Sequence, residues 1–214
     1  MRRFALVLLV ALSTPLLMGA ADSIFPSIRT REMNQTDRDE LDAISAYLNG
    51  MVTLKGGFVQ IAPSGDMSEG TFYLSKPGKL RFEYNPPVPV LLVADGHSVA
   101  VANRQLRTVD TYPLFETPLH LILDKTIDLR HSPQFVGMQH QQGSVVINMR
   151  SNQAHSKANI TLVFTEPAYE LRQWTVLDNQ GLATTVALRD LQPGAAMAPS
   201  LFVLPDKNSF GPKR

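Results

Sequence analysis

Cysteine is absent from the 214-residue chain. Disulfides, which many small secreted domains need to compensate for a thin core, are therefore excluded. A chain of this length can bury enough apolar surface without them, and a single domain is the first expectation. No cysteine follows the N-terminal segment that a lipid could modify. We therefore expect a mature protein that is soluble and not lipid-anchored.

An excess of charge is also lacking, because 20 Lys and Arg face 19 Asp and Glu, a formal net charge of +1. Loss of Arg2 and Arg3 with an export signal would change this to about −1. Nucleic-acid binding depends on clustered basic residues that neutralise phosphates. We therefore expect no nucleic-acid partner.

Catalytic and metal-binding signatures are missing as well. The chain has no G-x-S-x-G, G-x-x-x-x-G-K or G-x-G-x-x-G sequence, the patterns that present nucleophiles and phosphate cradles. No pair of histidines has the H-x-x-x-H or H-E-x-x-H spacing of a zinc site; they are His97, His120, His131, His140 and His155. We therefore expect that the protein is not an enzyme and that it binds no metal and no cofactor.

The N-terminus has the order of a secretory signal peptide. Arg2 and Arg3 precede an apolar run over Phe4–Leu17, and small residues follow at 19–21. A retained membrane span is the alternative, but the run is shorter than the roughly 20 residues that cross a bilayer. We assign 1–21 to a signal peptide, 22–36 to an N-terminal extension and 37–214 to the folded domain.

One amphipathic helix follows the extension. Thr36 can cap it, and Asp37, Asp39 and Glu40 lie where a helix N-terminus stabilises negative charge. Its apolar residues recur at spacings of three and four: Leu41, Ile44, Tyr47, Leu48 and Met51. We expect the helix to end near Asn49 and Gly50.

Beyond Leu54 the period changes to two. Leu80, Phe82 and Tyr84 share one strand face, while the charged residues between them share the other. The same alternation recurs at 145–149, 160–164 and 182–188, with turn residues between the strands. Roughly ten short strands without βαβ spacing indicate a mainly β fold, a strongly curved antiparallel sheet or incomplete barrel.

One segment departs from the strand pattern. Thr117 precedes Pro118, the order of a capping hydroxyl and a proline at the first helical position. The turn that follows, through Leu123, is apolar nearly all round, so it needs apolar neighbours on several sides. We expect a short helix that plugs the concave side of the sheet.

Several short motifs occur in a defined order. They are Phe58-Val59-Gln60, Gly70–Leu74, Lys76-Pro77, Leu80–Tyr84, Pro87, Val93-Ala94-Asp95-Gly96, Thr117-Pro118-Leu119, Leu177-Asp178-Asn179-Gln180-Gly181 and Phe202-Val203-Leu204-Pro205. In this succession, behind a signal peptide, the chain resembles the outer-membrane lipoprotein carrier family, the LolA proteins of the Gram-negative periplasm.

The resemblance implies an unclosed antiparallel half-barrel with helices as a lid over an apolar cavity. It also implies a periplasmic monomer that receives acylated lipoproteins, or another lipid cargo, from an inner-membrane ABC transporter. Delivery would be to an outer-membrane lipoprotein acceptor. Lys76 stands where the family often has an arginine tied to cargo release and lid closure; lysine keeps the cation but loses the planar fork of donors.

The candidate ligand-binding residues are apolar positions on the central strands and the plug helix, together with this lysine. They are Phe72, Leu74, Leu80, Phe82, Tyr84, Leu91, Val93, Leu119, Ile122 and Lys76. For each apolar residue ordinary core packing is the alternative, and for Lys76 a solvated turn residue. Trp174 could stack on a ligand or belong to the core. Two other functions stay open: a periplasmic lipid or glycolipid binding or sensor protein of the same fold, and an enzyme of lipid chemistry, for which no catalytic group is evident.

Overall fold

A computed structural model describes residues 33–151 and 158–206. The expected signal peptide and residues 22–32 of the expected extension lie outside these residues. No helix within the described ranges is both long and apolar enough to cross a bilayer.

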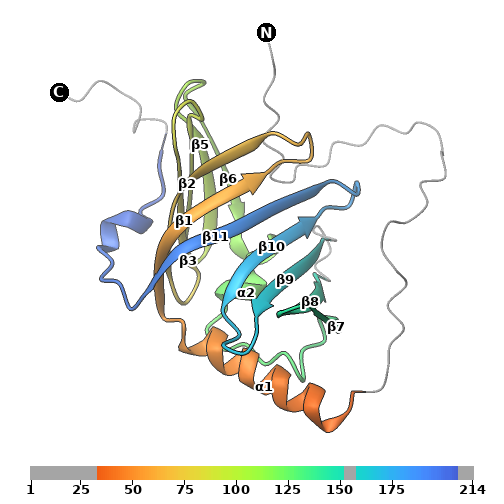
Figure 1. The fold of residues 1–214 in the computed structure, drawn as a ribbon. Coiled ribbons are helices and arrows are strands. Elements are labelled where there is room, and N and C mark those ends of the chain that lie inside the picture. Colours follow the sequence, from red (N-terminus) through yellow and green to blue (C-terminus); the bar gives the residue numbers. More distant parts are fainter. Residues whose placement is uncertain (1–32, 152–157, 207–214) are drawn as a thin grey trace, which may run out of the picture.

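The chain forms one antiparallel sheet of eleven strands in the order β6-β5-β4-β3-β2-β1-β11-β10-β9-β8-β7. The strands are β1 (Thr53–Ile61), β2 (Met67–Ser75), β3 (Lys79–Tyr84), β4 (Val90–Asp95), β5 (Ser98–Asn103), β6 (Thr108–Pro113), β7 (Phe135–Gln141), β8 (Ser144–Arg150), β9 (Asn159–Thr165), β10 (Leu171–Leu177) and β11 (Ala183–Pro193). The sheet is strongly curved and its edges, β6 and β7, do not pair (Figure 1). The predicted unclosed half-barrel is confirmed.

The strand topology explains where the predicted plug helix lies. Strands β1–β6 and β7–β11 are two meanders joined by pairing of β1 with β11. Because β6 and β7 are opposite edges, the chain between them must pass from one edge of the sheet to the other, and it does so on the concave side (Figure 1). This crossing contains the 3-10 turn η1 (Leu114–Glu116) and the short helix α2 (His120–Leu123), which lies inside the curve of the sheet in Figure 1.

The helix in the crossing starts later than the sequence predicts. The Thr117 hydroxyl does not cap it but donates to the Leu114 carbonyl at 2.8 Å, and the helix runs from His120 to Leu123. Thr117 instead closes the turn η1, so the prediction that Thr117 caps the helix was wrong. The predicted burial holds, since Leu121, Ile122 and Leu123 are all buried.

Helix α1 (Gln35–Gly50) lies across one end of the half-barrel (Figure 1). Asn34, not Thr36, caps it: the Asn34 side chain accepts from the Asp37 amide at 2.8 Å, and the Asp37 carboxylate accepts from the Asn34 amide at 2.9 Å. This reciprocal capping box starts the helix two residues earlier than predicted. The predicted apolar face is confirmed, with Leu41, Ile44 and Leu48 fully buried.

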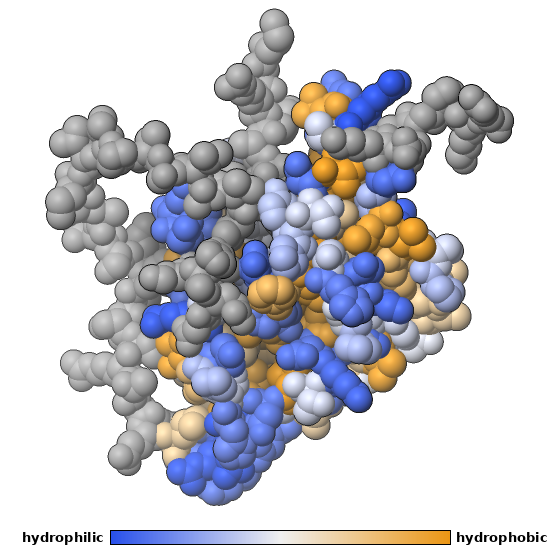
Figure 2. Space-filling model, turned by 180° about the vertical axis from the view of Figure 1, so that it is seen from behind, coloured by the Kyte–Doolittle hydropathy of each residue, from blue (hydrophilic) through white to orange (hydrophobic). Residues whose placement is uncertain are grey.

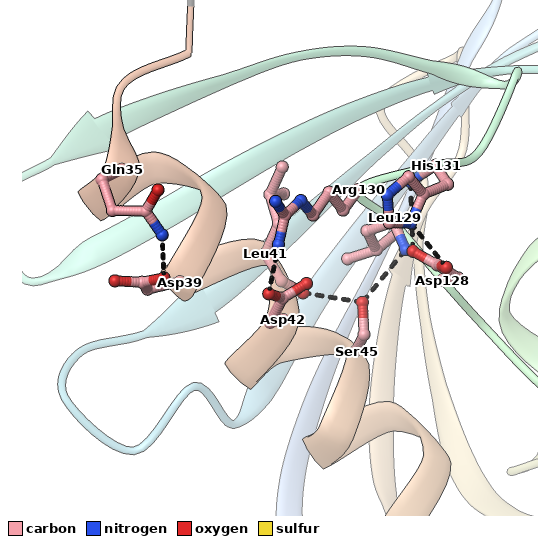
Figure 3. A network of polar contacts seen from close by, with 9 residues as sticks. All are labelled: Gln35, Asp39, Leu41, Asp42, Ser45, Asp128, Leu129, Arg130 and His131. Atoms are coloured by element: carbon pink, nitrogen blue, oxygen red, sulfur yellow. Dashed lines mark hydrogen bonds and ion pairs between the residues drawn. The ribbon is translucent and has the colours of Figure 1, made fainter.

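Helix α1 is also tied to the loop that follows α2. Asn49 exchanges two hydrogen bonds of 2.8 Å with the backbone of Ile127. Ser45 accepts from the Leu129 amide at 3.0 Å, and Arg130 donates to Asp42 at 2.9 Å (Figure 3). Helix α1 therefore fixes one end of the segment that crosses the concave side.

The alternation on β3 is as predicted. Leu80 and Phe82 are 1% and 4% exposed, whereas Arg81 points to the other face, where it donates to the Leu201 carbonyl at 3.0 Å. Strand β4 differs, because all residues from 90 to 94 are buried. Its outer face is covered by the C-terminal segment, which contains the turn η2 (Pro199–Phe202).

Candidate functional site

A pocket of about 140 Å³ lies between the concave face of the sheet and the crossing segment. It is lined by Gln60, Leu80, Phe82, Tyr84, Leu92, Tyr112, Glu116, Thr117, Pro118, Leu119, Trp174, Val176, Asp178, Leu182, Thr184 and Val186. Most of these side chains are apolar. Strands from both meanders contribute, so the pocket exists only because β1 pairs with β11.

Four of the ten predicted ligand-binding residues line this pocket: Leu80, Phe82, Tyr84 and Leu119. The first three form the concave face of β3, and Leu119 is the residue that precedes α2. The structure therefore brings the crossing segment against the strand that the sequence singled out. Whether these residues bind a ligand stays a prediction.

Six predicted residues do not line the pocket. Phe72, Leu74 and Ile122 belong to the main core, where Phe72 stacks on Phe82 at 5.9 Å between ring centroids. Leu91 and Val93 lie on the outer face of β4, in a small cluster with Ala102 that Val109 and Leu204 cover. Lys76 is the sixth of these residues.

The error on β4 is a shift of one residue. Leu92 lines the pocket and pairs with Phe82 of β3, whereas its neighbours Leu91 and Val93 face outward. A one-residue shift moves a side chain to the opposite face of a sheet. Because both faces of β4 are buried, its sequence has no alternation from which to choose the inner face.

Aromatic rings form the wall of the pocket. Phe82 meets Phe58 edge-on at 4.6 Å and Trp174 at 6.0 Å between centroids. Trp174 is 5% exposed and lines the pocket, so it belongs to the core and to the pocket wall at once. Edge-on packing of this kind orients the rings as well as burying them.

Two polar side chains meet within this wall. The Tyr84 hydroxyl donates to the Gln60 side-chain oxygen at 2.7 Å. Burial raises the pKa of Tyr84 above its ordinary range, which keeps the hydroxyl protonated and able to donate. Two carboxylates, Glu116 and Asp178, also line the pocket.

The surface outside the pocket is mixed. Large exposed apolar side chains include Met67, Leu106 and Phe115. On the face drawn in Figure 2, apolar side chains are interspersed with polar ones. The pocket is a place where described apolar residues converge around accessible space.

Comparison with known proteins agrees with this geometry. The sequence profile described as "Outer membrane lipoprotein carrier protein LolA" matches residues 49–205. The chain belongs to this family.

Relatives within the LolA family are distant. The outer-membrane lipoprotein carrier protein of Methylibium petroleiphilum is 29% identical over 117 residues, which are 49% of this chain and 58% of the relative. That of Methylococcus capsulatus is 25% identical over 178 residues, 79% of this chain and 85% of the relative. A solved LolA superfamily protein from Nitrosomonas europaea is 7% identical, with a TM-score of 0.43 over 76% of this chain and 97% of that one. The chain thus covers less than two thirds of the length of the first relative.

Lys76 is half-buried and hydrogen-bonded. Its ammonium donates to the Leu48 carbonyl at 2.8 Å, in the last turn of α1. Burial lowers the pKa of Lys76 to about 8, and nearby Asp124 opposes the shift. In the same turn the Gly78 amide donates to the Leu123 carbonyl at 2.8 Å. The turn therefore joins the ends of α1 and α2.

Several pocket residues were missed from the sequence, although some carried a signal. Thr184 and Val186 lie on an alternating face that the sequence did reveal, but nothing there indicates that β11 is adjacent to β1. Gln60 is part of the F-x-Q motif, yet a single polar residue on a strand does not indicate a pocket. Glu116 and Tyr112 come together with it only through the crossing.

One group of side chains away from the pocket could hold a cation. The ligand atoms of Asp37, Glu40 and His140 lie within 4.8 Å of one another. Asp37 is already engaged in the capping box, and His140 also lies 3.1 Å from Glu166. These contacts join α1 to β7 and to the turn after β9.

Proposed function

We propose that this protein is a periplasmic carrier that shields the acyl chains of lipoproteins in the pocket. The observation that carries the proposal is the apolar pocket between the concave sheet and the crossing segment, in a chain of the LolA family. An N-terminal segment with the order of an export signal supports a periplasmic location.

An acylated protein needs such a carrier because hydrocarbon in water is costly. Each methylene left in water costs about 0.8 kcal/mol, so a long chain costs on the order of 10 kcal/mol. A dense, rigid cavity would hold the chain too firmly to release it. A pocket covered by a segment of the carrier itself can exchange self-contacts for cargo contacts at a small net cost.

Residues 118–123 are the part that we propose to move. The helix α2 has only four residues, and Leu119 packs into the pocket that cargo would occupy. Its far end is held by the bond from Gly78 to Leu123, and exposed residues 124–126 separate it from the loop tied to α1. Opening would then expose the pocket without unfolding α1.

The route that we propose for the cargo is the one that the resemblance to the family implies. Loading would come from an inner-membrane ABC transporter and delivery would be to an outer-membrane acceptor, with the carrier acting as a monomer. Lys76 would act in this cycle by holding the turn that joins α1 and α2, so that its contacts change when the lid opens.

Mass spectrometry of what co-purifies from the periplasm tests the proposal. We expect acylated protein on the wild type. A pocket variant, Leu182→Glu, should lose it, because Leu182 lines the pocket and is 36% exposed, so that the substitution is tolerated by the fold. The matched control is Leu106→Glu, which is 69% exposed and outside the pocket lining.

The outcome distinguishes the candidate functions. Free lipid in place of acylated protein would favour the lipid or glycolipid binding protein of the same fold. Polypeptide without any apolar ligand, or equal loading of Leu182→Glu and Leu106→Glu, would contradict the carrier function.

A further inference from the structure

Gln60 is an unexpected side chain in a pocket for hydrocarbon. It lies on the concave face of β1, and Tyr84 reaches it across β2. The position of β2 between them is Gly70, which pairs with Phe58 on one side and with Tyr84 on the other. Since Gly70 has no side chain, the Tyr84 ring can lean over it, 5.0 Å from Phe58 between centroids.

The contact leaves one end of the Gln60 amide available. Tyr84 donates to the amide oxygen, which orients the amide nitrogen away from that bond. Within residues 33–151 and 158–206 no hydrogen bond from this nitrogen is found, and it is not among the fully buried unpartnered atoms. It offers two N–H donors to whatever fills the pocket.

A hydrocarbon tail alone would not satisfy these donors. A tail that displaces water from the pocket leaves the N–H groups unpaired, and an unpaired buried donor weakens binding. A carbonyl oxygen at the head of the tail would accept from them. Fatty chains are joined to proteins and to glycerol through such carbonyls, in esters and amides.

The charges around the pocket further narrow the choice of head group on the ligand. The lining contains Glu116 and Asp178 and no lysine or arginine. An anionic head, such as the carboxylate of a free fatty acid, would be repelled. A neutral ester or amide carbonyl would not.

We propose that the Gln60 amide, oriented by Tyr84, donates to the acyl carbonyl of the ligand, so that the pocket recognises ester-linked or amide-linked acyl chains over plain alkyl chains. Gln60 is then a specificity-determining residue and Tyr84 a positioning residue. The inference rests on the carrier function proposed above and names the chemical class of its ligand.

Matched ester and ether ligands test the inference. One pair is a dipalmitoyl-glyceryl cysteine peptide and its dihexadecyl ether; the other is dipalmitoylglycerol and dihexadecylglycerol. Affinities are measured on the full chain by displacement of 1-anilinonaphthalene-8-sulfonate. We expect the ester to bind about tenfold more tightly than the ether in each pair, because the ester makes one additional hydrogen bond. The tighter pair identifies the source of the acyl group, protein or free lipid.

In the Gln60→Leu variant the ratio of ester affinity to ether affinity should fall close to one, while the affinity for ethers is kept. Tyr84→Phe keeps the ring and removes only the hydroxyl, so it should reduce the preference without loss of fold. Gln173→Leu makes the same change on β10 outside the pocket lining and should retain the tenfold preference. Melting temperatures verify that each variant is folded.

Two results would overturn this inference and leave the carrier function untouched. They are a wild type that binds esters and ethers equally, and a Gln60→Leu variant that keeps the preference. Failure of all four ligands to displace the dye would overturn the carrier function and this inference with it.

Discussion

Gly70 shows how one missing side chain shapes the wall of the pocket. A Cβ at this position would lie 1.9 Å from the Glu83 carbonyl oxygen and 2.8 Å from the Phe58 ring. Backbone cannot yield as the end of a flexible side chain can. The glycine therefore permits both the close pairing of β2 with β3 and the reach of Tyr84 to Gln60.

Gly70→Ala should lower the free energy of unfolding by about 3 kcal/mol, because overpacking of a closely packed site costs this much. Urea denaturation measures the change. Gly50→Ala is the control: its Cβ would meet nothing within 4 Å, and alanine favours the helix, so its stability should be unchanged or slightly higher. Equal stabilities of the two variants would contradict the close contact at Gly70.

Lys76 makes stability depend on pH. Burial lowers its folded-state pKa to about 8, while an unfolded lysine titrates near 10.4. Between these values the unfolded chain binds more protons, so raising the pH favours the folded state. This gain in the free energy of unfolding is absent below pH 8 and complete above the pKa of the unfolded lysine.

The free energy of unfolding of the wild type should therefore rise, relative to Lys76→Met, from pH 7.5 to pH 10. We expect a relative gain on the order of 1 kcal/mol after allowance for solvent screening. Urea titrations of both proteins at each pH give the difference, in which all other lysines cancel. Parallel pH curves would mean that Lys76 is solvated.

At the scale of elements, α1 depends on its first turn and its side-chain ties. Asn34→Ala removes the cap of the Asp37 amide and should lower the free energy of unfolding by about 1 kcal/mol. Thr36→Ala is the control, because Thr36 lies inside the helix and is exposed. Thermal unfolding of both variants decides between the two candidate caps; a larger loss in Thr36→Ala would contradict the capping box.

Residues 118–123 are the part of the crossing segment whose movement the carrier function requires. An engineered disulfide that ties it to the sheet should abolish ligand uptake when oxidised. Because the chain has no cysteine of its own, the introduced pair cannot exchange with others. The same variant after reduction is its own control, and equal uptake in both redox states would show that the segment does not need to move.

At the scale of the whole molecule, the pocket results from the join of two meanders. Strands β1, β3, β4 and β6 supply one wall and β10 and β11 the other, and the chain that links the sheet edges covers the space between. A ligand in this space contacts both meanders and the crossing at once. Binding should therefore stabilise the fold as a unit.

An ester ligand at 100 times its dissociation constant should raise the free energy of unfolding by about 2.7 kcal/mol, provided that it binds only the folded state. The melting temperature measures this as a function of ligand concentration. Leu182→Glu, whose charge lies in the pocket lining, should show little rise. A rise of the same size in this variant would place the ligand elsewhere.

Local periodicity in the sequence was sufficient to predict α1 and most strand faces. The apolar spacing of α1 and the alternation along β3 reflect burial on one side, and burial on one side leaves a period that can be read without coordinates. The caps were less predictable. Asn34 and Thr36 are both good caps, and the choice between them depends on which one lets Asp37 complete the reciprocal bonds.

The pocket was only partly predictable. Leu80 and Phe82 were found because their strand alternates, whereas Leu92 was missed because β4 is covered on both faces. The contact of Gln60 with Tyr84 depends on two strand registers and on the glycine between them. None of these is a property of neighbours along the chain.

The amino-acid sequence by itself determined the helical character of α1, the mainly β character of the rest and the family to which the chain belongs, because periodicity and ordered motifs are local properties. The tertiary structure alone decided which faces meet, where the crossing segment lies and which polar groups enter the pocket. The physical reason is that these features come from pairing between distant strands, above all β1 with β11, and such pairing depends on the whole curved sheet.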